Sequence, residues 1–564
     1  MSRLLVRGGT VVDGTGADAR RADVRVVDGV IVTVEPDLRP IDGESVIDAS
    51  DALVTPGFID SHTHFDPTLW WDPTCDPLAV HGVTSILIGN CSLSLAPAPA
   101  AHRDEIAGIF SYIEDIPRDV MEHAVPWSWN SFSEYQSALA ERRYGVNVGS
   151  LVGHSALRLS VMGSAAWERA AADDERAALA AAMAECMRAG AFGLSTSFFD
   201  KDADDRAVPS RLADDAEFRS LIDAVADGSG LLAFIPDVTR RSFLDDLERI
   251  ASLCGPRDVV STWNSLYHDD RRPRFAGEVL DHAASLQEQG RRIYPQISPR
   301  PVDVRVNWNG GMSFFLLPNG WHRFVQAQSA EKAAMIGDPE WRHIAREEWD
   351  ATTASFFPHR RPERVTFTSV SSAADDEWVG RSLADLAAAW SMHPSDALAD
   401  WVERNDLFPG VIARGVFNGN VDAVGDTLAH PAAVWSNSDA GAHLQMQCAA
   451  GDTTLLLTRY VRDQARFSIE HAVHQLTGRH AELFGFGGRG IVAPGKAADL
   501  VVFSLEELTW AGEVEVDDLP GGAMRLRRPP GGYRTTIVGG TVVQHAGVRS
   551  GALPGRLLKP EVVR

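Results

Sequence analysis

The chain has 564 residues, of which 45% are apolar, and its formal charge is −24. The length predicts roughly two to four domains, and the acidic surface argues against a nucleic-acid partner because it repels phosphate backbones. No apolar run reaches the length of about 18 residues that a membrane span needs. Five cysteines without a disulfide pattern, together with an N-terminus that lacks a signal-peptide apolar run, favour the cytoplasm.

The two ends of the chain share a β-strand pattern. Val-rich runs fill residues 3–55, and Asp28-Gly29 between two of them predicts a hairpin. The pattern returns in residues 498–503 and 536–544, where Gly539-Gly540 predicts a second hairpin. We therefore expect residues 1–55 and 485–564 to form one small β-sandwich domain, with the middle of the chain inserted between its halves.

The middle of the chain, residues 56–484, alternates strand and helix patterns. A clear helix pattern covers residues 173–188 and is closed by Gly190. Eight strand-and-helix units of this kind indicate an α/β fold with a (β/α)₈ TIM barrel, which usually needs about 250 residues. The eight expected strands are residues 54–61, 83–90, 146–153, 191–197, 230–236, 258–263, 291–297 and 432–438.

Most of the surplus length lies between the seventh and eighth expected strands. Residues 300–430 are rich in Trp, His and Arg and contain helix patterns. An insertion at this point of a barrel lies at its mouth, so a lid or substrate arm is one interpretation. A packing or oligomer-contact subdomain is the other, and the sequence does not decide between them.

The segment Gly57–His64 carries the strongest functional signal. His62 and His64 follow an apolar run and are two residues apart. In a strand, residues i and i+2 point to the same face, so both imidazoles are aimed at one point at the strand's end. This arrangement predicts a metal site.

Other chemically capable residues also fall where barrel strands end, which is where such folds place their active sites. Cys91 follows the second strand and Asp439 the eighth, with His443 in the next turn. Cys91 is either a thiolate ligand or a buried small side chain, and Asp439 either a ligand and base or a helix N-cap. Two further catalytic candidates are His154, after the third strand, and Tyr294, on the seventh. Either could instead have a structural role, and for His443 a supporting role is the favoured interpretation.

The types of these side chains suggest the chemistry. Imidazole, thiolate and carboxylate ligands together suit zinc, which lowers the pKa of a bound water to about 7. Asp439 is the natural general base, passing the proton on to a leaving nitrogen. His154 and Tyr294 are candidates to stabilise the charge that develops on the carbonyl oxygen.

The chain resembles the amidohydrolase superfamily, specifically its D-aminoacylase (N-acyl-D-amino-acid deacylase) branch. The resemblance implies that His62, His64, Cys91 and Asp439 are metal ligands and that Asp439 is also the general base. It covers nearly the whole chain, and the matching segments are residues 4–16, 54–64, 82–97, 151–158, 192–197, 438–443 and 489–503.

Two features depart from the branch's pattern. The resemblance implies a metal-binding histidine on each of the fifth and sixth strands, but Phe234 and Trp263 stand where we would align them. The lysine that binds the substrate carboxylate in the branch is also missing. One zinc is therefore favoured over two, although recruitment of another ligand or loss of the metal remain alternatives. Phe234 and Trp263 are expected to make the pocket wall apolar and aromatic.

These observations predict a metal-dependent amidohydrolase that cleaves an N-acyl amino acid or a related small amide, hydrophobic amides included. A hydrolase of a cyclic amide, lactone, carbamate or ester on the same scaffold is an alternative. A catalytically silent scaffold or binding protein is another. The expected partner is a small-molecule substrate, with no nucleic acid and no membrane, and the sequence is compatible with a homo-oligomer.

Overall fold

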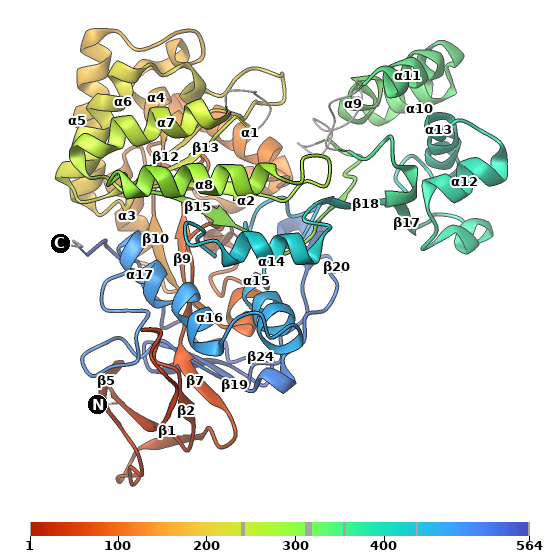
Figure 1. Ribbon diagram of the computed structural model, residues 1–564. Helices are drawn as coiled ribbons and strands as arrows, with labels where there is room; N and C mark the ends of the chain where they lie inside the picture. The colour runs from red at the N-terminus through yellow and green to blue at the C-terminus, as the bar shows by residue number, and fades with distance from the viewer. Residues whose placement is uncertain (1, 238–242, 311–318, 353–356, 436–437, 562–564) are drawn as a thin grey trace.

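A computed structural model shows a mixed α/β fold with a main body, a β-rich base and a projecting lobe (Figure 1). The base contains the N-terminus, and the lobe stands to one side of the main body. The structure describes residues 2–237, 243–310, 319–352, 357–435 and 438–561.

The two ends of the chain share a sheet in the base. β7 (Leu53–Pro56) pairs antiparallel with β19 (Leu500–Phe503) within a seven-stranded sheet. Valine and leucine side chains from both ends form a common apolar core, which explains why segments so distant in sequence associate. The other strands of this sheet are β2 (Thr10–Val11), β3 (Arg20–Arg21), β22 (Thr535–Val538), β23 (Thr541–His545) and β24 (Val548–Arg549).

Both predicted hairpins are confirmed. Val27 pairs with Val30 around Asp28-Gly29, and Val538 pairs with Thr541 around Gly539-Gly540. The first hairpin lies in a four-stranded sheet of β1 (Arg3–Arg7), β4 (Asp23–Val27), β5 (Val30–Glu35) and β6 (Ser45–Asp48).

Parallel strands run through the main body in two sheets. Their orders are β10-β9-β8 and β11-β12-β13-β14-β15, and every neighbouring pair is parallel. β10 leads into β11 across the single residue Leu151, so the two sheets are continuous along the chain. The strands are β8 (Phe58–Asp60), β9 (Val83–Ile88), β10 (Asn147–Ser150), β11 (Val152–Gly153), β12 (Gly193–Ser197), β13 (Leu231–Ile235), β14 (Ser261–Leu266) and β15 (Ile293–Ile297).

The segment expected as the eighth strand connects the last of these strands to the first. Val434 forms a parallel bridge with Gln296 of β15, and Ala440 forms one with Thr63 just after β8. The backbone N–H of Asp439 donates to the carbonyl of His62 at 3.1 Å. The segment is thus bridged on both sides without being a regular strand, and residues 436–437 of the expected 432–438 lie outside the described residues.

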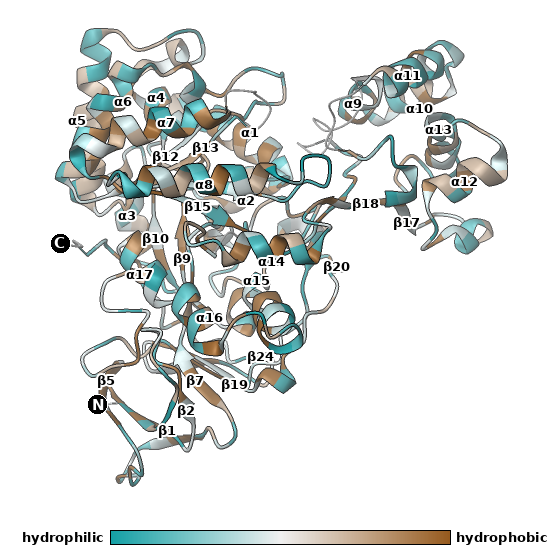
Figure 2. Cartoon of the chain, in the orientation of Figure 1, coloured by the Kyte–Doolittle hydropathy of each residue, from teal (hydrophilic) through white to brown (hydrophobic). Residues whose placement is uncertain are grey.

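Amphipathic helices cover the parallel strands, with their apolar faces turned inward (Figure 2). The predicted helix at residues 173–188 is confirmed as α5 (Asp173–Ala189). It ends at Gly190, whose φ of 113° favours glycine. The other helices of this layer include α1 (Arg103–Ile113), α4 (His154–Met162), α6 (Asp215–Asp227), α7 (Phe243–Cys254), α8 (Phe275–Glu288) and α14 (Val421–Ala429).

The projecting lobe has an apolar core of its own, built around buried indoles such as Trp321 and Trp401. Two strands, β16 (Val302–Arg305) and β18 (Gly410–Phe417), pair antiparallel at its base. The rest of the lobe is β17 (Val365–Ser369), α9 (Asn319–Gln326), α10 (Ser329–Gly337), α11 (Pro339–Ala351), α12 (Leu383–Trp390) and α13 (Pro394–Arg404).

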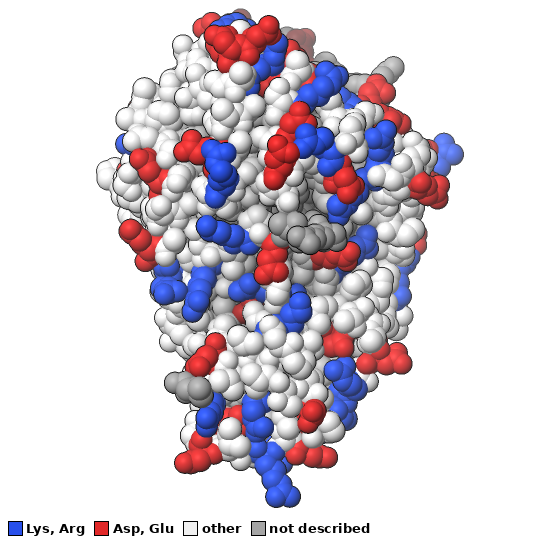
Figure 3. Space-filling model, turned by 90° about the vertical axis from the view of Figure 1, so that its left-hand side faces the viewer, with Lys and Arg blue, Asp and Glu red and all other residues white. Residues whose placement is uncertain are grey.

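Basic and acidic side chains are interspersed on the face of the molecule shown in Figure 3. Within the described parts of the chain, no helix combines the length and the apolarity that crossing a membrane requires.

Candidate metal centre and substrate cavity

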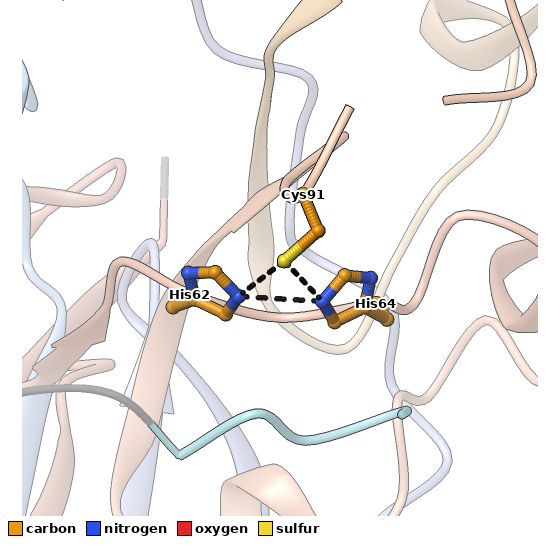
Figure 4. A group of neighbouring side chains, drawn as sticks. All are labelled: His62, His64 and Cys91. Atoms are coloured by element: carbon orange, nitrogen blue, oxygen red, sulfur yellow. Dashed lines mark hydrogen bonds between the residues drawn. The ribbon is translucent and has the colours of Figure 1, made fainter. Parts of the chain in front are cut away.

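Four donor side chains from three segments converge beyond the ends of β8 and β9. The Nε2 atoms of His62 and His64 are 3.3 Å apart, and the Cys91 Sγ lies 3.2 Å from the first and 3.5 Å from the second (Figure 4). The Oδ1 of Asp439 lies 3.6 Å from Nε2 of His62 and 3.4 Å from Nε2 of His64. His62, His64 and Cys91 are buried and form a group that could hold a metal ion.

Hydrogen bonds of their backbone N–H groups fix the positions of the two histidines. The carboxylate of Asp60 accepts from the N–H of His62 at 3.3 Å, and the N–H of His64 donates to the carbonyl of Ala440 at 2.8 Å. Gly441 has a φ of +89°, and a Cβ there would lie 2.8 Å from the carbonyl carbon of His64. Only glycine lets the loop that carries Asp439 pass this close to the His-X-His segment.

The turn that carries Cys91 is held by the side chain of Asn90. Its amide Nδ2 donates to the carbonyl of Leu87 at 2.9 Å and to that of Thr63 at 3.3 Å. Cys91 and Asp439 both have left-handed backbones, with φ of 58° and 61°. Such conformations are unfavourable for most residues and cluster at functional sites, where the surrounding structure enforces them.

These donors fit a zinc ion. Donors at zinc's usual bond lengths of about 2.0 to 2.3 Å in a tetrahedron lie about 3.3 to 3.7 Å apart. The five separations given above run from 3.2 to 3.6 Å, close to that range. Burial lowers the pKa of His62 to about 3, which keeps its imidazole neutral and its lone pair available. Burial also raises the pKa of the Cys91 thiol to about 12, so a cation is needed to hold it as a thiolate.

Glu114, which follows α1, lies behind His64. Its Oε1 lies 3.0 Å from Nδ1 of His64, on the side of the ring away from the other donors. A carboxylate at this nitrogen favours the tautomer that leaves Nε2 free to bind a metal. His443 lies near both acids, with Nε2 3.7 Å from Oδ2 of Asp439 and Nδ1 4.0 Å from Glu114. Burial acts to raise the pKa of Asp439. In the absence of a metal, His64, His443 and His62 outweigh burial and hold this pKa well below its usual range.

A cavity of about 220 Å³ opens beside the donors. His64, Cys91, Glu114, Asp439 and His443 line one part of it. Most of the remaining wall is apolar and comes from both the main body and the base of the lobe: Ile113, Phe199, Ile235, Phe243, Leu266, Phe275, Val302, Val304, Val416, Phe417 and Met446.

The aromatic wall was expected from Phe234 and Trp263, and this expectation is wrong. Both side chains point outward into the helix layer, where Trp263 packs on Phe243 with ring centroids 5.3 Å apart. Their strand neighbours Ile235 and Asn264 face the cavity instead. The amide Nδ2 of Asn264 lies 3.1 Å from Nε2 of His62, so a neutral amide occupies a position beside the metal donors on the sixth strand.

His154 lies away from this cavity in a buried network of the helix layer. Its Nε2 is 2.8 Å from Glu217 on α6, and its Nδ1 is 3.0 Å from Thr196. Glu217 also pairs with the buried guanidinium of Arg158. The network explains why a histidine stands at this strand end: it links α4 to α6.

Tyr294 also lies away from the cavity. It packs against an apolar cluster that includes Ile59, Leu87 and Phe484. The phenol that does line the cavity is Tyr267, which stacks on Phe417 with ring centroids 5.4 Å apart. No sequence pattern marks Tyr267 or Glu114 as functional, whereas Asn264 directly follows an expected strand.

Replacing Glu217 with alanine is expected to destabilise the protein by about 3 to 5 kcal/mol, because the Arg158 guanidinium is then buried without a counter-charge. Urea denaturation at pH 7 measures this. The matched control is Glu122→Ala, which breaks an exposed pair with Arg118 and should cost about 0.5 kcal/mol or less. Equal losses in the two variants would contradict the assignment.

The same interaction predicts a pH dependence. Burial acts to raise the pKa of Glu217, but His154 and Arg158 outweigh it and lower the pKa to about 2, from about 4.5 for an ordinary glutamate. A carboxyl group whose pKa is lower in the folded than in the unfolded state stabilises the fold at pH values above its unfolded-state pKa. This stabilisation is lost as the pH falls from about 5 towards 2. The stability gap between wild type and Glu217→Ala should narrow over this window.

Comparison with known proteins identifies the class to which this fold and site belong. Residues 45–544 match the amidohydrolase family, and the chain therefore belongs to that family. An uncharacterised protein of Mycobacterium tuberculosis is 30% identical, over 96% of this chain and 92% of its own. D-aminoacylase of Alcaligenes xylosoxydans xylosoxydans is 28% identical, over 89% and 87%.

The fold agrees with this assignment. N-acyl-D-glutamate deacylase from Bordetella bronchiseptica, solved with zinc and a phosphonate inhibitor, superposes with a TM-score of 0.68 at 24% identity, over 99% of both chains. Within the family, the chain falls in the D-aminoacylase branch, and it is a D-aminoacylase-like hydrolase of carbon–nitrogen bonds other than peptide bonds.

Proposed function

We propose that this chain is a zinc-dependent amidohydrolase that cleaves the amide bond of an N-acyl amino acid or a related small amide, hydrophobic amides included. The observation that carries the proposal is the convergence of His62, His64, Cys91 and Asp439 at the edge of a mostly apolar cavity. A single zinc is favoured because the cavity-facing residues of the fifth and sixth strands are Ile235 and Asn264, which do not supply imidazoles.

The proposed architecture is a closed (β/α)₈ barrel in residues 56–484, beside a β-sandwich of residues 1–55 and 485–564. The bridges from Val434 and Ala440 to the last and first parallel strands support closure. Residues 300–430 act as a substrate arm, since Val302, Val304 and Phe417 at the lobe's base form part of the cavity wall.

The residues of the site divide the work between them. When bound, zinc polarises the carbonyl and activates a water at neutral pH. Asp439 accepts the proton of the attacking water and passes it to the leaving nitrogen. Glu114 holds His64 in the ligating tautomer, and the mostly apolar wall lowers the local polarity, which strengthens these electrostatic interactions.

Metal content measured together with turnover of an amide panel tests the proposal. The panel contains N-acetyl-D- and N-acetyl-L-amino acids, aryl amides, a cyclic amide and a lactone. We expect about one zinc per chain and faster turnover of hydrophobic amides than of N-acetyl-D-amino acids. A metal-free, inactive but folded protein would favour the silent scaffold, and turnover of the cyclic amide or lactone alone would favour the alternative hydrolases.

A further inference from the structure

The charged groups that line the cavity are mostly acidic. Besides Asp439, three carboxylates line it, from Glu114, Asp200 and Asp269, and Arg272 is the one Lys or Arg side chain among the described lining residues. Asp439 belongs to the metal donors and Glu114 lies against His64. The remaining two acids and the arginine are therefore the groups that could select a substrate by charge.

Arg272 is poorly placed to bind a substrate carboxylate. Its guanidinium lies 3.4 Å from Asp269 and covers the ring of Phe275 at 4.3 Å from the ring centre. Its side chain is 48% exposed, so water screens its charge. Asp269 in turn is held by Arg271 at 2.8 Å. The charges of Arg272 and Asp269 therefore neutralise each other at the rim of the cavity.

Asp200, which follows β12, is in the opposite situation. The residue is only 5% exposed, it lines the cavity, and its Oδ2 is buried without a hydrogen-bond partner among the described residues. Burial raises the pKa of Asp200 to about 6, although Ser197 and Arg211 partly offset it. Leaving a buried carboxylate oxygen unpaired is costly, so a native protein retains one where something else supplies the donor.

We propose that Asp200 is a specificity-determining residue that accepts hydrogen bonds from a protonated amine on the substrate. The inference rests on the proposed amide hydrolysis in this cavity, and it assigns the substrate class: a small amide with an apolar body and a cationic group, rather than one with a free carboxylate. The apolar wall contacts the body through side chains such as Phe199 and Phe243, and Asp200 pairs with the charge.

Binding of small, non-hydrolysable probes to the zinc-loaded full chain tests this without relying on turnover. The probes are 3-phenylpropylammonium, 3-phenylpropanol and 3-phenylpropanoate, which share one apolar body and differ in charge, and calorimetry measures each dissociation constant. We expect the ammonium to bind about tenfold more tightly than the alcohol, and the carboxylate to bind most weakly.

Asp200→Asn should weaken ammonium binding by about tenfold and leave the alcohol within about twofold. The matched control is Asp204→Asn, which removes the same charge from the same loop at a side chain that is 78% exposed, and it should change neither. Because coordination of a free amine to zinc does not need Asp200, the variant also separates that contact from the proposed one.

Three results would overturn the inference: a wild type that binds the carboxylate best, a wild type that does not bind the ammonium, or an Asp200→Asn variant with unchanged ammonium affinity. The order of the three probes' affinities for the wild-type protein tests the inference even if the variant does not fold. Ammonium binding without hydrolysis of any amide would instead contradict the proposed function and leave the subsite intact.

Discussion

Cys91→Ala is expected to reduce bound zinc from about one equivalent to below about 0.2 and to lower kcat/KM by at least about 10³-fold. The Sγ of Cys91 stands within 3.5 Å of both histidine Nε2 atoms, so its loss removes one corner of the donor set and the negative charge that a thiolate brings. Metal analysis after dialysis, together with initial rates on the best amide, measures both effects.

The other cysteines supply the control. Cys254 is also a buried free thiol, but it lies in the apolar layer between helices, so Cys254→Ala should retain zinc and most of the activity. Full zinc content and activity in Cys91→Ala would show that the cysteine is a packing residue and that the metal rests on the remaining donors.

Asp439→Asn is expected to lower kcat by about 10² to 10⁴-fold, the range that general acid–base catalysis usually contributes. An amide of the same size keeps the loop in place, since the backbone N–H of residue 439 still bonds to His62. The asparagine cannot accept the proton of the attacking water, however. Single-turnover rates at pH 7 measure the loss, and zinc content measured in parallel separates base from ligand.

A matched change on the same loop tests whether the effect is local. His443 contacts Asp439 at 3.7 Å but is not a donor in the cluster, so His443→Gln should lose far less activity than Asp439→Asn. Comparable losses in both variants would assign the proton transfer to the pair instead. Wild-type rates in Asp439→Asn would exclude the carboxylate as the base.

The convergence of His62, His64, Cys91 and Asp439 could be predicted from the sequence because it depends on local patterns. Two histidines at i and i+2 after a buried strand share a face whatever the rest of the chain does. Cys91 and Asp439 follow strand patterns too, and parallel strands bring their carboxyl ends to one edge. The hairpins at Asp28-Gly29 and Gly539-Gly540 are equally local, because their turn residues specify the backbone.

The sequence does not show which side chains of the fifth and sixth strands point toward the cavity. β13 reads Leu-Leu-Ala-Phe-Ile, apolar on both faces because both are buried, so nothing in it shows which alternate residues face inward. A shift of one residue along a strand moves the side chain to the other face. Phe234 and Trp263 were therefore expected to face the cavity, whereas Ile235 and Asn264 do. The place of His154 in the helix layer could not be predicted for another reason: its partner Glu217 comes from a later helix, and no local pattern indicates that pairing.

The loop acids Glu114 and Asp200 were missed because they follow a helix and a strand without any motif. Their roles depend on burial and on which atoms face them, and these are properties of the assembled structure.

The bond between the N–H of Asp439 and the carbonyl of His62 joins the beginning and the end of the parallel-strand segment. During synthesis, His62, His64 and Cys91 leave the ribosome long before residue 439 does, so the nascent chain carries two imidazoles and a thiol without their fourth corner. A metal captured at that stage would be held loosely and exchangeably. If the zinc site is as proposed, products truncated before Asp439 are expected to lose their ion to a competing chelator more readily than the full chain.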